Sequence, residues 1–167
     1  MKGSFKINIK EGKALDIKNF YKLFKGSVKK SFPEYSFKAK QSFFKKDYTE
    51  KQFLKWLAIK EIDLLLAFFN KEIVGYLVGG FSIGGISFIS WLVVKSKFQR
   101  KGIGSALLKR YEGIVKGKGL HKIHLWTNKR STQFYKKNGY ILVGHISKNF
   151  FGADDWLFYK KIQSPKY

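Results

Sequence analysis

The stretch VVKSKFQRKGIGSALL, residues 93–108, joins an apolar strand-like run to an apolar helical pattern through a short cationic segment. At its centre, QRKGIG, the residues Gly102 and Gly104 flank a single isoleucine. Glycine lets a backbone approach a ligand without a Cβ in the way, and the first N–H groups of a helix are unpaired and favour anions. The stretch therefore predicts a strand, a phosphate-binding turn and a helix, in that order.

Two common phosphate-binding motifs do not fit this stretch. The P-loop requires G-x-x-x-x-G-K followed by Ser or Thr, and the sequence contains no such string. The dinucleotide fingerprint would place Gly or Ala at position 107, where Leu107 stands, and an acidic residue about twenty positions later, where KIHLWTN has none. Both motifs are therefore set aside.

Hydrophobic periodicity predicts the elements on both sides of the stretch. Before it we expect a strand at 5–9, helices that begin after Asp16 and after Thr49, and strands at 63–69, 73–80 and 86–94. After it we expect a helix at 103–117, a strand at 122–127, a short helix at 131–137, and strands from 140 and at 156–162. The predicted fold class is α/β, one domain over residues 1–167, with a largely antiparallel sheet flanked by helices in the order β-α-α-β-β-β-α-β-α-β-β and one βαβ crossover at its centre.

The starts of the first two helices carry capping signals. Asp16 precedes an apolar stripe of helical spacing and is expected to cap it. Thr49 and Gln52 form a capping-box pair ahead of the second helix.

The segment 73–94 contains no charged side chain, and it is long enough for a membrane-spanning helix. The alternative is a hairpin of two buried strands. The glycine pairs at 79–80 and 84–85, with β-branched and aromatic residues between them, favour the hairpin, and we expect no membrane span.

The composition restricts the chemistry. The chain has no cysteine, which excludes disulfides, thiolate zinc sites and a cysteine acyl-enzyme. Its formal net charge of +23 favours non-specific contact with polyanions, and a basic nucleic-acid-binding module is the alternative of a different class. Nucleic-acid readout depends on arginine, of which there are three, so this alternative is the weaker one. With no apolar targeting segment at the N-terminus, we expect a cytoplasmic protein.

Two motifs carry a resemblance to a known family. VVKSKFQRKGIGSALL is similar to the cofactor motif of the GNAT superfamily of acyl-CoA-dependent N-acyltransferases, whose pattern is Gln or Arg, two residues, Gly, one residue, and Gly or Ala. NKRSTQFYKKNGY, residues 128–140, resembles the second motif of the same superfamily, with an Asn seven positions before a tyrosine, then Gly and an aromatic residue. The two motifs lie in roughly residues 86–145. They say little about which molecule accepts the acyl group.

The resemblance implies an N-acetyltransferase that uses acetyl-CoA as co-substrate, with direct transfer to an amine and no acyl-enzyme. Tyr135 would stand near the thioester sulfur and protonate the leaving thiolate. The residues implied for cofactor binding are Leu92, Val93, Val94, Gln99, Arg100, Lys101, Gly102, Ile103, Gly104, Ser105, Asn128 and Tyr135. In this reading, the backbone of Leu92 and Val94 pairs with the pantetheine arm, residues 99–105 bind the pyrophosphate, and Asn128 orients the arm.

The general base is missing from its usual place. The superfamily often has a glutamate four residues before the position of Val94, and this chain has Ser90 there. Deprotonation of the amine therefore depends on ordered water, on an acceptor that arrives neutral, or on another carboxylate, for which Glu34, Asp154 and Asp155 are the candidates.

The resemblance places acceptor specificity in two loops, residues 31–37 and 147–155. Their aromatic content suits a peptide backbone or an apolar amine. We therefore favour a peptide or protein amine over a small-molecule amine, with Glu34, Tyr35, Phe150 and Asp154 as the expected substrate contacts. No metal is expected, because His121 and His124 are spaced to point to opposite faces of a strand. A monomer and a homodimer both remain open.

Overall fold

The computed structural model describes residues 6–166. Its helices are α1 Ile17–Ser31, α2 Phe37–Ser42, α3 Glu50–Ala58, α4 Ile103–Gly117 and α5 Thr132–Lys137. Its strands are β1 Ile7–Glu11, β2 Ile62–Phe69, β3 Glu72–Ile83, β4 Ile86–Val94, β5 Lys122–Thr127, β6 Ile141–Ile146 and β7 Asp155–Lys161.

The strands form one sheet in the order β1-β2-β3-β4-β5-β7-β6. Every neighbouring pair is antiparallel except β4 and β5, which are parallel and are joined through α4. The predicted fold class is therefore confirmed, including the βαβ crossover at the centre of the sheet. Strand β7 lies between β5 and β6, so the last strand of the chain is not at the edge of the sheet.

The segment between α1 and α3 differs from the prediction. Helix α2 and a π-helical turn, Phe43–Asp47, occupy a region for which no helix was expected. Ser36 is the N-cap of α2, and its side chain accepts a hydrogen bond from the Ala39 N–H at 3.1 Å. This helix has only six residues and buries none of them, so it leaves no amphipathic period in the sequence.

Two predicted element starts also differ in detail. Strand β1 begins at Ile7, and the predicted residue Phe5 lies outside the described residues. Asp16 precedes α1, but its carboxylate does not cap that helix. The Asp16 carboxylate instead accepts the Lys13 N–H at 2.9 Å, because a short 3₁₀ turn at Ala14–Asp16 comes before α1. At α3 the prediction is confirmed, since the Thr49 hydroxyl accepts the Gln52 N–H at 3.1 Å.

The uncharged segment 73–94 forms the β3–β4 hairpin, which confirms that alternative. None of the helices within residues 6–166 has the length and apolar character needed to cross a membrane.

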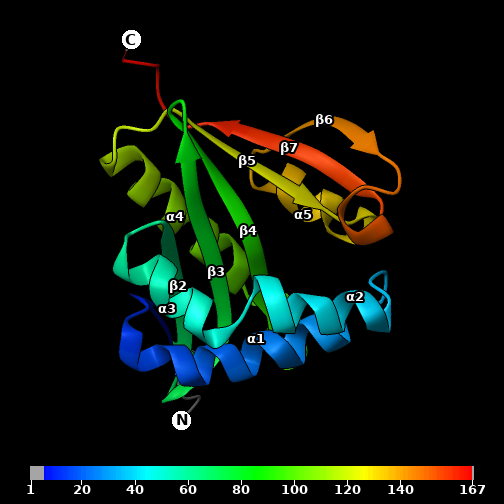
Figure 1. Ribbon diagram of the computed structural model, residues 1–167. Helices are drawn as coiled ribbons and strands as arrows, with labels where there is room; N and C mark the ends of the chain where they lie inside the picture. Colours follow the sequence, from blue (N-terminus) through cyan, green and yellow to red (C-terminus); the bar gives the residue numbers. More distant parts are fainter. Residues whose placement is uncertain (1–5, 167) are drawn as a thin grey trace.

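Helices cover both faces of the sheet, as Figure 1 shows. On one face, Phe20 and Phe24 of α1 and Phe53 of α3 are fully buried against the sheet. On the other face, Leu107 and Tyr111 of α4 are equally buried. Each such side chain stabilises the fold by roughly 1.5–3 kcal/mol through burial, so the sheet is held from both sides.

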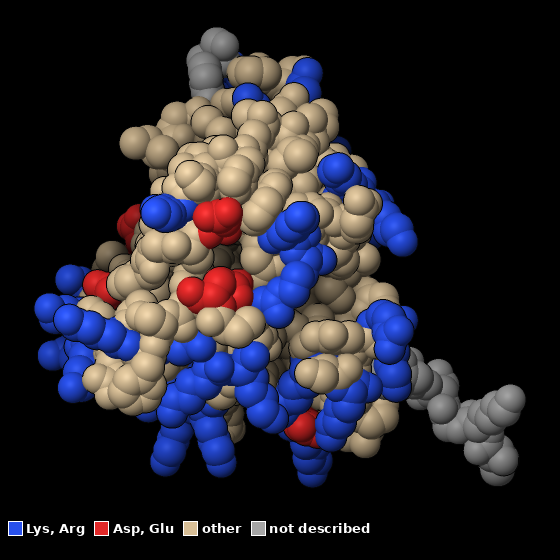
Figure 2. Space-filling view, turned by 90° about the vertical axis from the view of Figure 1, so that its right-hand side faces the viewer, with Lys and Arg blue, Asp and Glu red and all other residues tan. Residues whose placement is uncertain are grey.

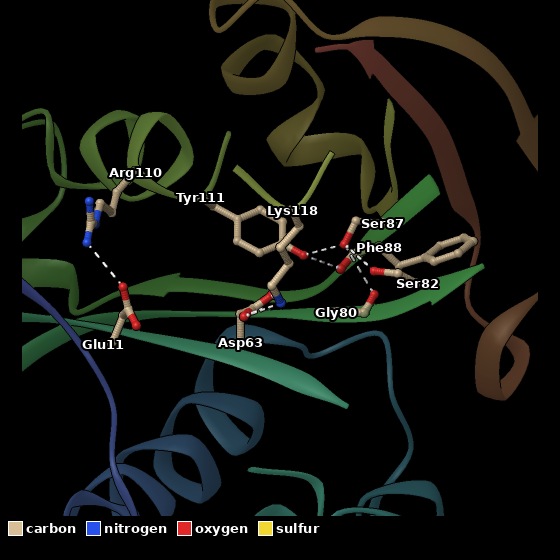
Figure 3. Close-up of polar contacts among 9 residues, drawn as sticks. All are labelled: Glu11, Asp63, Gly80, Ser82, Ser87, Phe88, Arg110, Tyr111 and Lys118. Atoms are coloured by element: carbon tan, nitrogen blue, oxygen red, sulfur yellow. Dashed lines mark hydrogen bonds and ion pairs between the residues drawn. The ribbon is translucent and has the colours of Figure 1, made fainter. Parts of the chain in front are cut away.

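A buried polar network lies between α4 and the β3–β4 hairpin (Figure 3). The Tyr111 hydroxyl forms a 2.7 Å hydrogen bond with the Ser87 hydroxyl, and it also donates to the Phe88 carbonyl at 3.3 Å. Ser87 is fully buried and accepts a further bond from Ser82 at 3.1 Å. At Gly79 an added Cβ would overlap the Tyr111 ring, so glycine there lets the ring reach Ser87. The network fixes α4 relative to the start of β4.

Candidate functional site

A cleft opens where the two central parallel strands separate. The pairing of β4 with β5 covers only Ile86–Ile89 and Lys122–Leu125, after which β5 continues beside β7 alone. Figure 1 shows the two strands diverging from this point. A bulge bends β4 there, because Trp91 pairs with Val78 and Ile89 with Gly79, which leaves Ser90 without an opposite residue. The resulting cleft has a volume of about 850 Å³.

The backbone of β4 presents polar groups to this cleft. The Lys95 N–H donates to the Val74 carbonyl of β3 at 2.8 Å, so the amide groups one residue earlier point away from β3. By the same alternation, the N–H and C=O groups of Leu92 and Val94 face the side that β5 has left. The Gln99 side chain donates to the Val94 carbonyl at 2.9 Å. The backbone groups of Leu92 are therefore free to pair with a pantetheine arm, as expected, while the amide groups of Val93 face β3.

Helix α4 begins beside the end of the cleft. Gly102 is its N-cap, in the left-handed conformation with φ of 78°, and an added Cβ at Gly102 would meet no atom within 4 Å. Its carbonyl accepts the first helical hydrogen bond, from Ala106 at 3.0 Å. The N–H groups of Ile103, Gly104 and Ser105 therefore have no partner within the helix and carry its positive dipole end. The turn therefore has the free backbone donors that the predicted phosphate site requires.

The two glycines of the turn have different surroundings. At Gly104 an added Cβ would lie 3.0 Å from the ring of Phe134, so this position is needed for packing against α5. Only Gly102 faces open space. Arg100 also has a left-handed φ of 59°, and Lys101 lies over the Phe98 ring at 5.7 Å. Residues 100–105 lie beyond Gln99, the last residue of this loop that lines the cleft.

Tyr135 of α5 lines the same cleft and is 6% exposed. Its ring contacts Phe134, Tyr140 and Phe158 at centroid distances of 5.1–5.8 Å, and its hydroxyl has no hydrogen-bond partner among residues 6–166. Burial raises its pKa well above the usual value near 10. The hydroxyl is therefore protonated at neutral pH and able to donate to a group in the cleft.

Asn128 links two loops instead of projecting freely. Its Oδ1 accepts the Ser131 N–H at 3.2 Å, and its Nδ2 donates to Glu34 at 3.0 Å. Arg130 also donates to Glu34 at 3.0 Å and to the Ser31 carbonyl at 3.0 Å. The loop after β5 is thereby tied to the loop after α1. With both carboxylate oxygens engaged, Glu34 is a poor candidate for the general base.

The two aspartates before β7 have opposite environments. Asp154 is exposed and contacts His145 at 3.2 Å. Its pKa is held below the usual range, mainly by the hydrogen bond from the Lys148 N–H and secondly by the hydrogen bond with His145. Asp155 is 7% exposed and accepts hydrogen bonds from the Asn149 side chain at 3.0 Å and the Phe150 N–H at 3.4 Å. Both aspartates line the cleft, but only Asp155 is buried there.

The structure gathers most of the predicted site around one cleft. All four predicted substrate contacts line it, as do Ser90 and most of the predicted pantetheine contacts. Sequence reasoning missed several further lining residues, namely Phe32, Tyr48, Trp91, Trp126, Thr127 and Arg130. The strand period places Trp91 and Val93 on one face, but no sequence signal shows that this face meets Tyr48. No group of three or more metal-ligating side chains occurs in the described part of the chain.

Comparison with known proteins gives a family and a fold. A model of the acetyltransferase (GNAT) family matches residues 27–140. Comparison with curated proteins finds no significant match.

Several solved structures resemble this one in fold. The PaiA N-acetyltransferase of Thermoplasma acidophilum, solved with coenzyme A, is 22% identical, with a TM-score of 0.77 over 93% of this chain and 99% of that chain. The YncA protein of Salmonella typhimurium, solved with its cofactor acetyl-CoA, is 16% identical, with a TM-score of 0.76 over 96% of each chain. The ribosomal-protein-S18-alanine N-acetyltransferase of Escherichia coli is 14% identical, with a TM-score of 0.69 over 95% of this chain and 96% of that chain.

Proposed function

This chain belongs to the acetyltransferase (GNAT) family, which uses acetyl-CoA as co-substrate, and from that premise we propose that it acetylates a primary amine of a peptide or protein. Acetyl transfer is supported most strongly by three features that occur together at the cleft. They are the open edge of β4, the unpaired N–H groups at the start of α4 and the buried Tyr135 hydroxyl. We also propose that residues 1–167 act as one acetyltransferase domain, as a monomer or homodimer in the cytoplasm.

The residues present fit the co-substrate. The turn at Gly102 offers unpaired N–H groups and space that a side chain would fill, which suits a pyrophosphate. The C=O of Leu92 faces the cleft, where it would accept a hydrogen bond from the pantetheine arm. The co-substrate supplies the acetyl group as a thioester, and the aromatic end of the cleft at Tyr35 and Phe150 is left for the acceptor.

Acetyl transfer from this site needs three contributions from the protein. A bond forms between the amine nitrogen and the acetyl carbon, the carbon–sulfur bond breaks, and the amine loses a proton while the sulfur gains one. Tyr135 is assigned the proton that the sulfur gains, because burial keeps it protonated. The Leu92 N–H is assigned to donate a hydrogen bond to the carbonyl oxygen of the acetyl group. Ser90 cannot take the proton of the amine, which passes to water or to Asp155.

The proposal is tested first by thermal unfolding with and without acetyl-CoA. A ligand at about 100 times its Kd adds roughly 2.7 kcal/mol to the stability, so the melting temperature should rise by several degrees. An unchanged melting temperature at saturating acetyl-CoA would exclude the function. Turnover is then measured against peptide N-termini, lysine peptides and small amines.

A further inference from the structure

The charges that line the cleft are unevenly compensated. Among the described lining residues, the acidic ones are Glu34, Asp154 and Asp155. Glu34 is paired with Arg130, whereas Asp154 is exposed and contacts His145, which is a cation only when protonated. Asp155 has no cationic side chain within ion-pair distance in the described part of the chain. Asp155 is thus the buried acidic group of the cleft that is left for a ligand.

The Asp155 carboxylate is also incompletely hydrogen-bonded. The Asn149 side chain and the Phe150 N–H both donate to its Oδ2, and Oδ1 accepts no hydrogen bond from residues 6–166. The residue is only 7% exposed. A carboxylate in such a position is costly unless a cation or a further donor reaches it. Its free oxygen is therefore a binding point for a cationic donor.

Aromatic rings line the same cleft as this carboxylate. Tyr35 and Phe150 lie with centroids 6.2 Å apart, and Phe32 stacks on Tyr35 at 5.8 Å. Tyr35 and Asp155 both line the cleft, and the pKa of Tyr35 is raised above its usual value, first by burial and then by the charge of Asp155. Aromatic faces attract ammonium groups and also bury apolar substituents.

We propose that the acceptor is a monocationic primary amine on an apolar group, with its ammonium held by Asp155 and its apolar part against Tyr35 and Phe150. The proposal rests on the proposed function and names its substrate class. An acceptor with several positive charges is disfavoured, because its further charges would meet Lys30 and Arg130 at the same cleft. Asp155 binds and positions the reacting nitrogen, and the proton that the ammonium loses before attack passes to water or to the Asp155 carboxylate.

Three acceptors test the charge requirement on the wild-type protein. We compare phenethylamine, a peptide with N-terminal phenylalanine and a C-terminal amide, and spermidine, at saturating acetyl-CoA. We expect kcat/KM for at least one of the two monocations to exceed that for spermidine by about tenfold or more. Phenethylamine and the peptide distinguish a small amine from a peptide α-amine as the source of this chemistry. Spermidine as the best acceptor would overturn the proposal.

A matched pair of variants tests Asp155 itself. Asp155→Asn keeps an oxygen for Asn149 and Phe150 but removes the charge. Asp63→Asn, which changes an aspartate that is paired with Lys118 and does not line the cleft, is the control. We expect Asp155→Asn to raise the KM of the preferred acceptor by about 30-fold, and Asp63→Asn to change it less than about twofold. Equal effects of the two variants, or no effect of Asp155→Asn, would contradict the assignment.

Coenzyme A binding, measured by calorimetry on each variant, separates this inference from the proposed function. An unchanged CoA affinity of Asp155→Asn shows that the variant is folded and supports a role in acceptor binding alone. Loss of CoA affinity with the same substitution would overturn that role. If wild type itself fails to bind CoA, the proposed function fails, whereas acetylation of spermidine in preference to monocations overturns only the acceptor class.

Discussion

Gly102 is the residue on which the proposed phosphate turn depends most. Its φ of 78° is one that side-chain-bearing residues rarely adopt, and the space around it is empty. Gly104 has a different reason to be glycine, the 3.0 Å approach to the Phe134 ring. Gly104 is thus required for packing, whereas the role proposed for Gly102 is in binding.

We expect Gly102→Val to abolish CoA binding with the fold retained, because a β-branched side chain would fill the cradle and strain the turn. Calorimetric titration with CoA checks this, with circular dichroism as the fold measurement. Gly113→Val on the exposed side of the same helix is the control, and it should leave CoA affinity unchanged. Wild-type CoA affinity in Gly102→Val would move the phosphate site elsewhere.

Tyr135 is the only residue assigned to proton transfer at the sulfur, so its hydroxyl should affect rate and not cofactor binding. We expect Tyr135→Phe to lower kcat by about 10²-fold with little change in the Kd of acetyl-CoA. Because burial raises its pKa above 10, Tyr135 stays protonated up to that pH and should produce no limb of the pH–rate profile below it.

Single-turnover kinetics provide the measurement for Tyr135→Phe. The matched control is Tyr140→Phe, which changes a neighbouring buried tyrosine that does not line the cleft. A Tyr135→Phe variant as fast as wild type would remove the proposed acid.

At the scale of elements, the site depends on where β4 leaves β5. The bulge at Ser90 and the end of pairing at Ile89 turn the second half of β4 away from β5, so its backbone groups face the cleft. The start of β4 is in turn fixed to α4 by the Tyr111–Ser87 bond (Figure 3). The N-terminus of α4, where phosphate binding is proposed, and the open edge of β4 are therefore linked through this contact.

We expect Gly79→Ala to weaken this arrangement, because its Cβ would overlap the Tyr111 ring and displace the hydroxyl from Ser87. Overpacking of this kind costs about 1–3 kcal/mol. Urea denaturation measures the loss. Gly113→Ala, at an exposed helix position with no neighbour within 4 Å, should instead stabilise by up to about 1 kcal/mol. Equal stability of the two variants would contradict the packing role of Gly79.

For the whole molecule, the dominant property is its charge of +23. Figure 2 shows lysine and arginine side chains gathered on the lower part of one face, below a small group of acidic ones. A few further acidic side chains lie at the edge of this face and among the basic ones, which are far more numerous. Such a surface attracts polyanions without selecting among them.

We expect the protein to bind single-stranded RNA weakly, with an affinity that falls steeply between 50 and 200 mM salt, on the order of a hundredfold or more. Fluorescence anisotropy at several salt concentrations measures this. Added CoA should compete poorly, because the lysines lie mainly outside the cleft. Tight binding that persists in high salt and is sequence-specific would instead favour the nucleic-acid-binding alternative.

Local patterns in the sequence were sufficient for most elements and for the family. Alternating and helical periods predicted the hairpin at 73–94, the helix after Gly102 and the order of the strands, because burial of one face repeats at fixed spacing. Helix α2 was missed because it is short and buries nothing. The motif at 99–104 could be recognised because a phosphate turn needs its glycines and its helix start within a few consecutive residues.

Only the tertiary structure decided how distant residues divide the work. The sequence offered Glu34, Asp154 and Asp155 as equivalent carboxylates. It did not show that Arg130 and Asn128 donate hydrogen bonds to Glu34, and it did not show that Asp155 is buried. The contact between Glu34 and Arg130 joins residues 96 positions apart. No local period encodes such a contact, because it arises only when the sheet has brought the loops after α1 and β5 to the same end of the cleft.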